Sequence, residues 1–178
     1  MRARSSGIAA WPKASTSRRN DAARCAAHRD HDMRDLLFVY GTLKQGFFNH
    51  HVNRGERVPG EFITRQRFPL VLISPRYLPW LVNAPGEGEH VVGELYRVDD
   101  DMLRAMDELE RVGEAGWYER VGISVRALDD DEPEPLACHV YLGSRWRAEA
   151  EGIRLGPLPE YTRSHAELFL RSGPLTLG

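Results

Sequence analysis

Cysteine, lysine and long hydrophobic runs are the scarce features of this 178-residue sequence. Its two cysteines, Cys25 and Cys138, are too few for the disulfide framework of a small secreted protein, and no CxxC pair supports structural zinc. No stretch approaches the roughly 18 consecutive apolar residues of a membrane-spanning helix. These absences exclude a disulfide scaffold and a helical membrane protein, and they favour a reduced, cytoplasmic protein.

An excess of charge of one sign is also lacking, because 24 basic residues stand against 26 acidic ones. The only lysines are Lys13 and Lys44, and the arginines are spread without a patch in the expected folded part. This balance gives no reason to expect a nucleic-acid partner. The content of 42% hydrophobic and 28% charged residues is ordinary for a globular chain of about one domain.

Residues 1–32 differ from the rest of the chain. They are rich in alanine, serine and arginine, and they contain seven basic residues against three acidic ones. Without an apolar run they are no secretory signal, and they fit a transit peptide only weakly. We expect residues 1–32 to be a disordered or non-native extension, with Met33 as the start and residues 33–178 as the domain.

Short apolar runs bounded by glycine or proline predict strands in the remainder. The expected strands cover residues 36–40, 60–67, 70–73, 91–98, 118–125 and 137–142, and residues 79–82 form a further apolar run that ends at a turn signal. One clear helix follows the aspartates at 99–101 and runs to about Arg111, and a terminal helix is expected over 159–171. Many short strands with one strong middle helix predict a small α+β fold, in which helices pack on a sheet or barrel.

The middle helix carries a carboxylate on its apolar face. At about 100° per residue, Glu110 falls inside the stripe formed by Met102, Leu103, Met106 and Leu109. Burying an ionised carboxylate is costly unless it is paired or protonated. Two interpretations are open: Glu110 bends into water or pairs with an arginine, or it lies at the floor of a pocket with a raised pKa that suits acid–base catalysis.

A loop bounded by glycines follows the first strand and begins with Tyr40, Gly41, Thr42 and Leu43. Backbone N–H groups in such a loop can face a ligand, and glycine lets that ligand approach the main chain closely. The alternative is a tight turn that binds nothing. The GxxxxGK[ST] pattern of a nucleotide-binding P-loop is absent.

These residues carry a family resemblance. The segment Phe38-Val39-Tyr40-Gly41-Thr42-Leu43-Lys44, with Gly46 and Asn49-His50, resembles the opening of the gamma-glutamylcyclotransferase-like (AIG2-like) superfamily, and within it is most similar to the gamma-glutamylamine cyclotransferases. Further matching stretches follow in the family's order as far as residue 142: Tyr77-Leu78-Pro79-Trp80-Leu81, Val92-Gly93-Glu94-Leu95-Tyr96, Met102-Leu103-Arg104, Asp107-Glu108-Leu109-Glu110 and Tyr118-Glu119-Arg120. The resemblance implies a small mixed β-barrel of five or six strands with peripheral helices.

The resemblance also implies a reaction that needs no cofactor and no metal. The α-amino group of a gamma-glutamyl amide attacks its own side-chain carbonyl, which forms 5-oxoproline and releases an amine. The family's catalytic glutamate ends an Asp-x-x-Glu stretch and corresponds to Glu110, which the helical wheel marks independently. The loop backbone of Tyr40, Gly41, Thr42 and Leu43 corresponds to the part that binds the glutamyl group.

Other roles stay open at this point. Trp80 is expected to line the pocket or to be a core or surface residue, and Tyr118 and Arg120 to belong to the site or to the scaffold. The stretch between Glu110 and Tyr118, which includes residues 112–116, looks longer than in related sequences, so the sequence does not define the leaving amine. It does not define the oligomeric state either. The alternatives are a cyclotransferase acting on gamma-glutamyl peptides or on a gamma-glutamylated natural-product intermediate, and a non-catalytic small-molecule binding module. A hydrolase is disfavoured because no activated nucleophile or metal site is visible.

Overall fold

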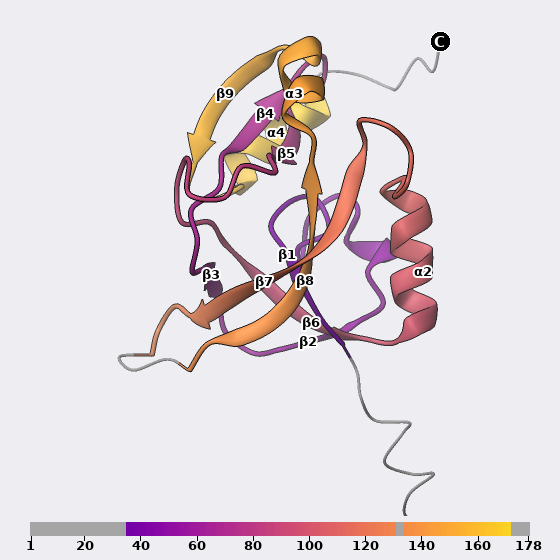
Figure 1. Cartoon of the computed structure of the whole chain (residues 1–178), viewed down its shortest axis with the longest axis vertical. Helices are drawn as coiled ribbons and strands as arrows, with labels where there is room; N and C mark the ends of the chain where they lie inside the picture. Colours follow the sequence, from indigo (N-terminus) through magenta and orange to yellow (C-terminus); the bar gives the residue numbers. More distant parts are fainter. Residues whose placement is uncertain (1–34, 131–133, 172–178) are drawn as a thin grey trace, which may run out of the picture. The chain divides into compact units, whose positions relative to one another are not determined.

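The computed structural model describes residues 35–130 and 134–171, so the expected extension at residues 1–32 and Met33 lie outside the described residues. The elements follow one another as β1 (Asp35–Val39), the 3-10 helix η1 (His50–Val52), β2 (Glu56–Arg57), β3 (Phe62–Thr64), β4 (Leu70–Ile73), β5 (Leu78–Leu81), β6 (Val92–Val98), α2 (Asp100–Leu109), β7 (Tyr118–Ala127), β8 (Leu136–Gly143), α3 (Arg145–Glu151), β9 (Ile153–Leu158) and α4 (Arg163–Arg171) (Figure 1).

Five strands close a barrel in the order β1-β8-β7-β3-β6, because β6 pairs back with β1. The β1–β8 pair is parallel and the other barrel pairs are antiparallel, which makes the barrel mixed. The short strand β2 adds to β6 beside β3. The prediction of a small mixed β-barrel with peripheral helices is therefore confirmed.

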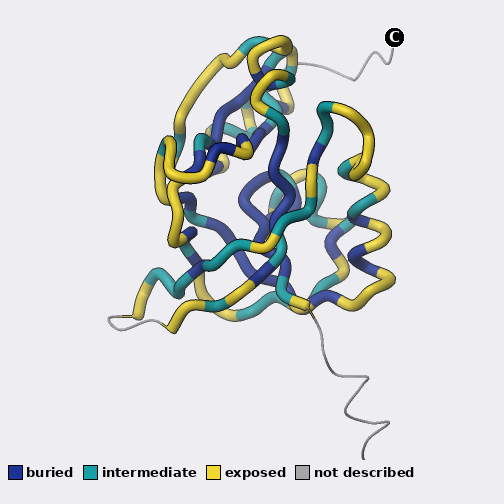
Figure 2. The backbone as a smooth tube through the Cα atoms, viewed as in Figure 1, coloured by how far each residue is buried: buried dark blue, intermediate teal, exposed yellow. Residues whose placement is uncertain are grey.

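The apolar run of β1 is buried on both of its faces. Leu37 and Val39 pack in one hydrophobic cluster with residues of α2, whereas Phe38 packs in a second cluster with residues of β3, β6 and β8. A strand buried on both sides needs a continuous apolar sequence rather than an alternating one. In Figure 2 the buried backbone follows the central strands, and the exposed backbone follows the loops and the outer face of α2.

Helix α2 begins at a side-chain cap and ends where the backbone turns left-handed. The Asp99 carboxylate accepts a hydrogen bond from the backbone N–H of Met102 at 2.8 Å, which satisfies one free donor of the first turn. The helix ends at Leu109 rather than Arg111, because Arg111 adopts a φ of +56°. Leu109 is 45% exposed, so its expected place in the buried stripe is wrong.

The segment after β8 departs from the sequence prediction. Helix α3 and strand β9 were not expected, and α4 begins at Arg163 rather than at residue 159. Helix α3 buries only Ala148, and the side chains of β9 are mostly exposed, so neither element has an apolar pattern that marks it. Strand β9 pairs with β4 in a separate antiparallel sheet of order β5-β4-β9. Within the described ranges, no helix is long and apolar enough to cross a membrane.

Candidate functional site

A cavity of about 200 Å³ lies where the loop after β1, the end of α2 and the start of β7 meet. Six of the seven residues expected at the site line it, from three separate parts of the chain: Tyr40, Gly41, Thr42, Leu43, Glu110 and Tyr118. The cavity is also lined by Asn49, Leu109, Trp117 and Tyr141, which were not assigned to the pocket from the sequence. The fold thus brings together the two motifs that the sequence marked separately.

Glu110 reaches the cavity from the C-terminal end of α2. Its backbone N–H still donates to the Met106 carbonyl at 2.9 Å, so the helix holds the residue although it follows the last helical position. Burial raises the pKa of its carboxyl group to about 7. Across residues 35–130 and 134–171, no donor or cation pairs with this carboxylate, so its desolvation is not offset. This environment favours the interpretation of Glu110 as a pocket residue.

Three tyrosines of the cavity wall have their hydroxyl groups fixed by acceptors. Tyr40 donates to the Tyr141 carbonyl at 3.0 Å, and Tyr118 donates to the Pro79 carbonyl at 3.2 Å. Tyr141 donates to the Asp107 carboxylate at 2.8 Å. Burial is the largest cause of a raised pKa for the Tyr40 hydroxyl, and the nearby charge of Glu110 is the next. Burial is also the largest cause of the raised pKa of Tyr118 and of Tyr141. The tyrosines therefore stay neutral near pH 7, where Glu110 titrates.

The loop after β1 lines the cavity and contains backbone donors that have no acceptor among the described residues. Asn49 fixes Thr42 from both sides, since its N–H donates to the Thr42 carbonyl and its amide to Thr42 Oγ1, each at 3.0 Å. Among the residues that the structure describes, none accepts a hydrogen bond from the N–H groups of residues 41–43. A Cβ atom at Gly41 would lie 3.0 Å from Pro79 Cγ, so a larger residue there would require the Pro79 ring to shift. These free N–H groups can bind an anionic or carbonyl oxygen.

Two buried charges fasten the far end of this loop, and the sequence analysis did not identify them. Lys44, only 4% exposed, places Nζ 2.9 Å from Glu160 Oε1. Glu94 accepts the backbone N–H of Gln45 at 2.8 Å, together with the Tyr96 hydroxyl at 2.7 Å. Burial alone raises the pKa of Glu94, but these hydrogen bonds and a nearby arginine outweigh it and lower the pKa. The sequence signal that could have identified Glu94 is its position on the apolar face of a strand with alternating side chains.

Trp80 does not line the cavity, although the sequence placed it among the candidate pocket residues. Its side chain is fully buried, its Nε1 donates to the Ser144 carbonyl at 3.1 Å, and its ring lies 4.2 Å from the Tyr118 ring. A Cβ atom at Gly143 would lie 2.1 Å from it, so the ring occupies the space that this glycine leaves. Trp80 therefore lies behind Tyr118 and supports the cavity wall without lining it.

Arg120 is part of the scaffold, because it pairs with an acidic residue of α2. Its Nε lies 3.4 Å from Asp107 Oδ1, the same oxygen that accepts the Tyr141 hydroxyl. Arg120 does not line the cavity. It therefore acts on the site only through the side chain that fixes Tyr141.

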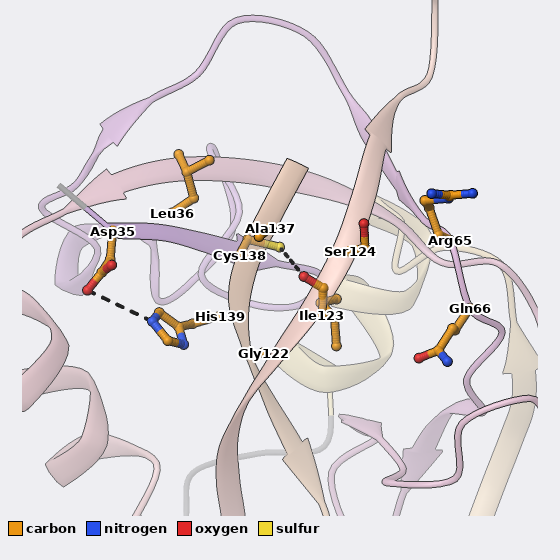
Figure 3. Close-up of a pocket in the computed structure, with 10 residues that line it drawn as sticks. All are labelled: Asp35, Leu36, Arg65, Gln66, Gly122, Ile123, Ser124, Ala137, Cys138 and His139. Carbon is orange, nitrogen blue, oxygen red and sulfur yellow. Dashed lines mark hydrogen bonds and ion pairs between the residues drawn. The ribbon is translucent and has the colours of Figure 1, made fainter. Parts of the chain in front are cut away.

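A larger depression of about 660 Å³ lies against β1, β7 and β8 (Figure 3). It contains Asp35, 3.9 Å from His139 Nε2, and the thiol of Cys138, which donates weakly to the Ile123 carbonyl. Burial raises the pKa of this thiol to about 12, so it is protonated at neutral pH and is a poor nucleophile. Size alone does not mark the site, and the chemistry favours the smaller cavity at Glu110.

Comparisons with known proteins converge on one family. A family model described as "Gamma-glutamyl cyclotransferase, AIG2-like" matches residues 37–163. The curated gamma-glutamylaminecyclotransferase of Mus musculus is 36% identical over 122 residues, 64% of this chain and 80% of the relative. The gamma-glutamylaminecyclotransferase of Homo sapiens is 39% identical over 121 residues, which cover 62% of this chain and 78% of the relative. The crystal structure of an AIG2-like protein from Mus musculus aligns with a TM-score of 0.61 and 33% identity, covering 72% of this chain and 88% of that one.

Proposed function

Because this chain belongs to the gamma-glutamyl cyclotransferase, AIG2-like family, we propose that it converts gamma-glutamylamines into 5-oxoproline and a free amine. Similar curated relatives are named gamma-glutamylaminecyclotransferases. The observation that carries the proposal is the carboxylate of Glu110, which faces the cavity unpaired among the described residues and has a pKa of about 7.

In the first step the α-amino nitrogen of the substrate attacks the carbonyl carbon of its own gamma-amide. Glu110 accepts a proton from that nitrogen as the new C–N bond closes the five-membered ring. The nucleophile belongs to the substrate, so the protein contributes mainly by holding the glutamyl chain folded for ring closure. The N–H groups of residues 41–43 are the candidate donors to the oxyanion or to the glutamyl carboxylate.

In the second step the bond between the carbonyl carbon and the leaving nitrogen breaks. Glu110 returns its proton to that nitrogen, so the amine leaves neutral and the carboxylate is regenerated. A group with a pKa near the working pH serves both transfers, because it gives up and takes up a proton with equal ease. Nucleophile, electrophile and leaving group lie in one substrate molecule, so the reaction needs no cofactor.

The proposal includes a small gamma-glutamyl molecule as the partner, without nucleic acid or membrane. It also includes a cytoplasmic location, based on the scarcity of cysteine. Gamma-glutamyl peptides and gamma-glutamylated natural-product intermediates remain alternative substrates, because they share the glutamyl half. A binding module of the same fold would not need an unpaired carboxylate in its cavity, which favours the enzyme.

The test is a product assay by mass spectrometry on the full chain and on Glu110→Gln. Glu108→Gln is the matched control, since Glu108 lies on the exposed face of the same helix. With a gamma-glutamylamine, the wild type and Glu108→Gln should form 5-oxoproline, and Glu110→Gln should lose at least about 100-fold in kcat. Full activity in Glu110→Gln would exclude this residue as the acid–base group.

A further inference from the structure

The three tyrosine hydroxyl groups of the cavity wall all donate away from Glu110. Tyr40 and Tyr118 donate to backbone carbonyls. Tyr141 donates to the carboxylate of Asp107. A tyrosine hydroxyl has a single proton, so in this arrangement none of the three can also donate to Glu110. A donor would stabilise the ionised form of Glu110 and make it a weaker base.

Of the three acceptors, the one that serves Tyr141 is a side chain and can be changed by substitution. Asp107 Oδ1 lies 2.8 Å from the Tyr141 hydroxyl. Asp107 precedes Glu110 by three residues, and helical residues with this spacing have Cβ atoms about 5–6 Å apart. Tyr141 and Glu110 also line the same cavity. The hydroxyl that Asp107 holds therefore lies beside Glu110.

Arg120 fixes the position of the Asp107 carboxylate. The pairing of β7 with β8 places Arg120 directly opposite Tyr141, so both side chains leave the same face of the sheet. Both reach the same oxygen of Asp107, the Arg120 Nε at 3.4 Å. The two charged side chains are 29% and 27% exposed, so the ion pair is only partly screened by solvent. The result is a fixed acceptor for the Tyr141 proton.

The charges at the mouth of the cavity are engaged elsewhere. Arg111 and Arg147 lie against the Trp117 ring, with their guanidinium carbons 4.1 Å and 4.0 Å from its centroid. Each of these arginines pairs with a nearby glutamate, and within residues 35–130 and 134–171 neither pairs with Glu110. The titratable groups that face Glu110 are thus the three tyrosines, from the loop after β1, from β7 and from β8, together with Asp107 on its own helix.

We propose that Asp107 is a positioning residue, which holds the Tyr141 hydroxyl group away from Glu110 and so leaves the catalytic carboxylate without a donor. This inference rests on the proposed function and assigns what sets the pH range of that site. Without Asp107 the Tyr141 hydroxyl loses its acceptor, and an unpaired buried hydroxyl is costly. It then turns to the neighbouring carboxylate of Glu110, which becomes a weaker base.

Profiles of kcat/KM against pH with a gamma-glutamylamine test the proposal on the full chain. The inflection of the wild type is expected near pH 7. In Asp107→Leu, which fills the space without an acceptor, we expect it to move down by about one to two pH units. This is the size of one hydrogen bond to a charged group. Asp107→Asn keeps an acceptor oxygen and guards against a folding defect, so it should keep most of the wild-type profile.

Tyr141→Phe then assigns the effect to the hydroxyl group. Alone it should leave the inflection near pH 7, because the hydroxyl does not donate to Glu110 in the wild type. In the double variant Asp107→Leu/Tyr141→Phe the inflection should return to near pH 7, which a merely structural role of Asp107 would not produce. Asp101→Leu, which removes an exposed carboxylate from the same helix, is the control and should keep the wild-type profile.

A second readout needs no substrate. The side-chain carboxyl carbon of Glu110 is titrated by ¹³C NMR in the same proteins, and its signal is identified as the one that Glu110→Gln lacks. We expect the titration midpoint to move down in Asp107→Leu and to return in the double variant, in parallel with the kinetic inflection.

The outcomes separate the two proposals. An unchanged midpoint in Asp107→Leu overturns the role of Asp107, and so does a lowered midpoint that persists in the double variant, since the freed Arg120 would then be its cause. Both results leave the cyclotransferase intact where 5-oxoproline still forms. Folded wild-type protein that forms no 5-oxoproline overturns the proposed function, whereas the NMR titration still decides whether Asp107 turns Tyr141 away from Glu110.

Discussion

The buried carboxylate of Glu94 accepts a hydrogen bond from the backbone N–H of Gln45 at 2.8 Å. Glu94 belongs to the barrel strand β6, and Gln45 lies two residues beyond Leu43, which lines the cavity. The contact thus ties the loop after β1 to the barrel wall. Its strength depends on the charge of Glu94, because an ionised acceptor forms the stronger hydrogen bond.

Glu94→Gln should loosen this loop. We expect KM to rise about fivefold to tenfold with a smaller change in kcat, and the free energy of unfolding to fall by about 1–3 kcal/mol. The pKa of Glu94 is lowered in the fold, so the stability it contributes is present above pH 4.5 and is lost in more acidic solution. Steady-state kinetics and urea unfolding check this, with the exposed Glu61→Gln as the control. An unchanged KM would contradict a role in positioning the loop.

Glu110 should lower the stability of the fold at the pH where the enzyme works. In the unfolded chain its carboxyl ionises near pH 4.5, whereas in the fold its pKa is about 7. The folded state therefore holds the extra proton between these values, and stability falls as pH rises through this range. Glu110→Gln, which stays neutral, should be more stable than the wild type by up to about 3 kcal/mol at pH 8.

Near pH 4.5 the same two proteins should be about equally stable, since the wild-type carboxyl is then protonated in the fold. Urea unfolding at both pH values measures the difference. A Glu110→Gln protein that is less stable than the wild type at pH 8 would mean that the carboxylate has a stabilising partner after all.

The pH dependence of catalysis should report the same carboxyl group. The plot of kcat/KM against pH reflects ionisations of the free enzyme and the free substrate. We expect activity to rise through an inflection near pH 7 as Glu110 becomes a base, with the substrate ammonium group contributing a separate inflection. An enzymatic inflection at pH 4–5 instead would indicate a solvated carboxylate and contradict the buried geometry.

The support behind the cavity wall can be tested with two glycines on neighbouring strands. Gly143→Ala places a Cβ atom 2.1 Å from the buried Trp80, which should cost about 3 kcal/mol of stability and reduce activity through the displaced Tyr118. Gly122→Ala on β7 meets nothing within 4 Å and should be tolerated. Thermal unfolding of the pair checks this. Equal melting temperatures would show that Trp80 can move aside.

The sequence predicted the parts of the site that leave a local pattern. The continuous apolar run of β1, the helical wheel that singled out Glu110 and the glycine-bounded loop are all readable within a few residues of chain. The barrel strands were recognised for the same reason, although their pairing into a closed barrel came from the family resemblance.

The rest depends on contacts between distant segments. Trp80 could be a pocket or a core residue by pattern, and only its fit against Gly143 decides for the core. Strand β9 has no apolar run because its side chains are mostly exposed, so its pairing with β4 was invisible. The contact of Arg147 with Trp117 spans 30 residues and joins α3 to a loop, and no local rule predicts it.

The central claim is intramolecular ring closure, and an isotope experiment tests it most directly. A gamma-glutamylamine is converted by the full chain in water enriched in ¹⁸O, and the products are resolved by mass spectrometry. The account predicts 5-oxoproline without ¹⁸O, formed in equal amount with the free amine and lost in Glu110→Gln. Free glutamate carrying one ¹⁸O atom would mean that water attacks the amide, and it would contradict the mechanism.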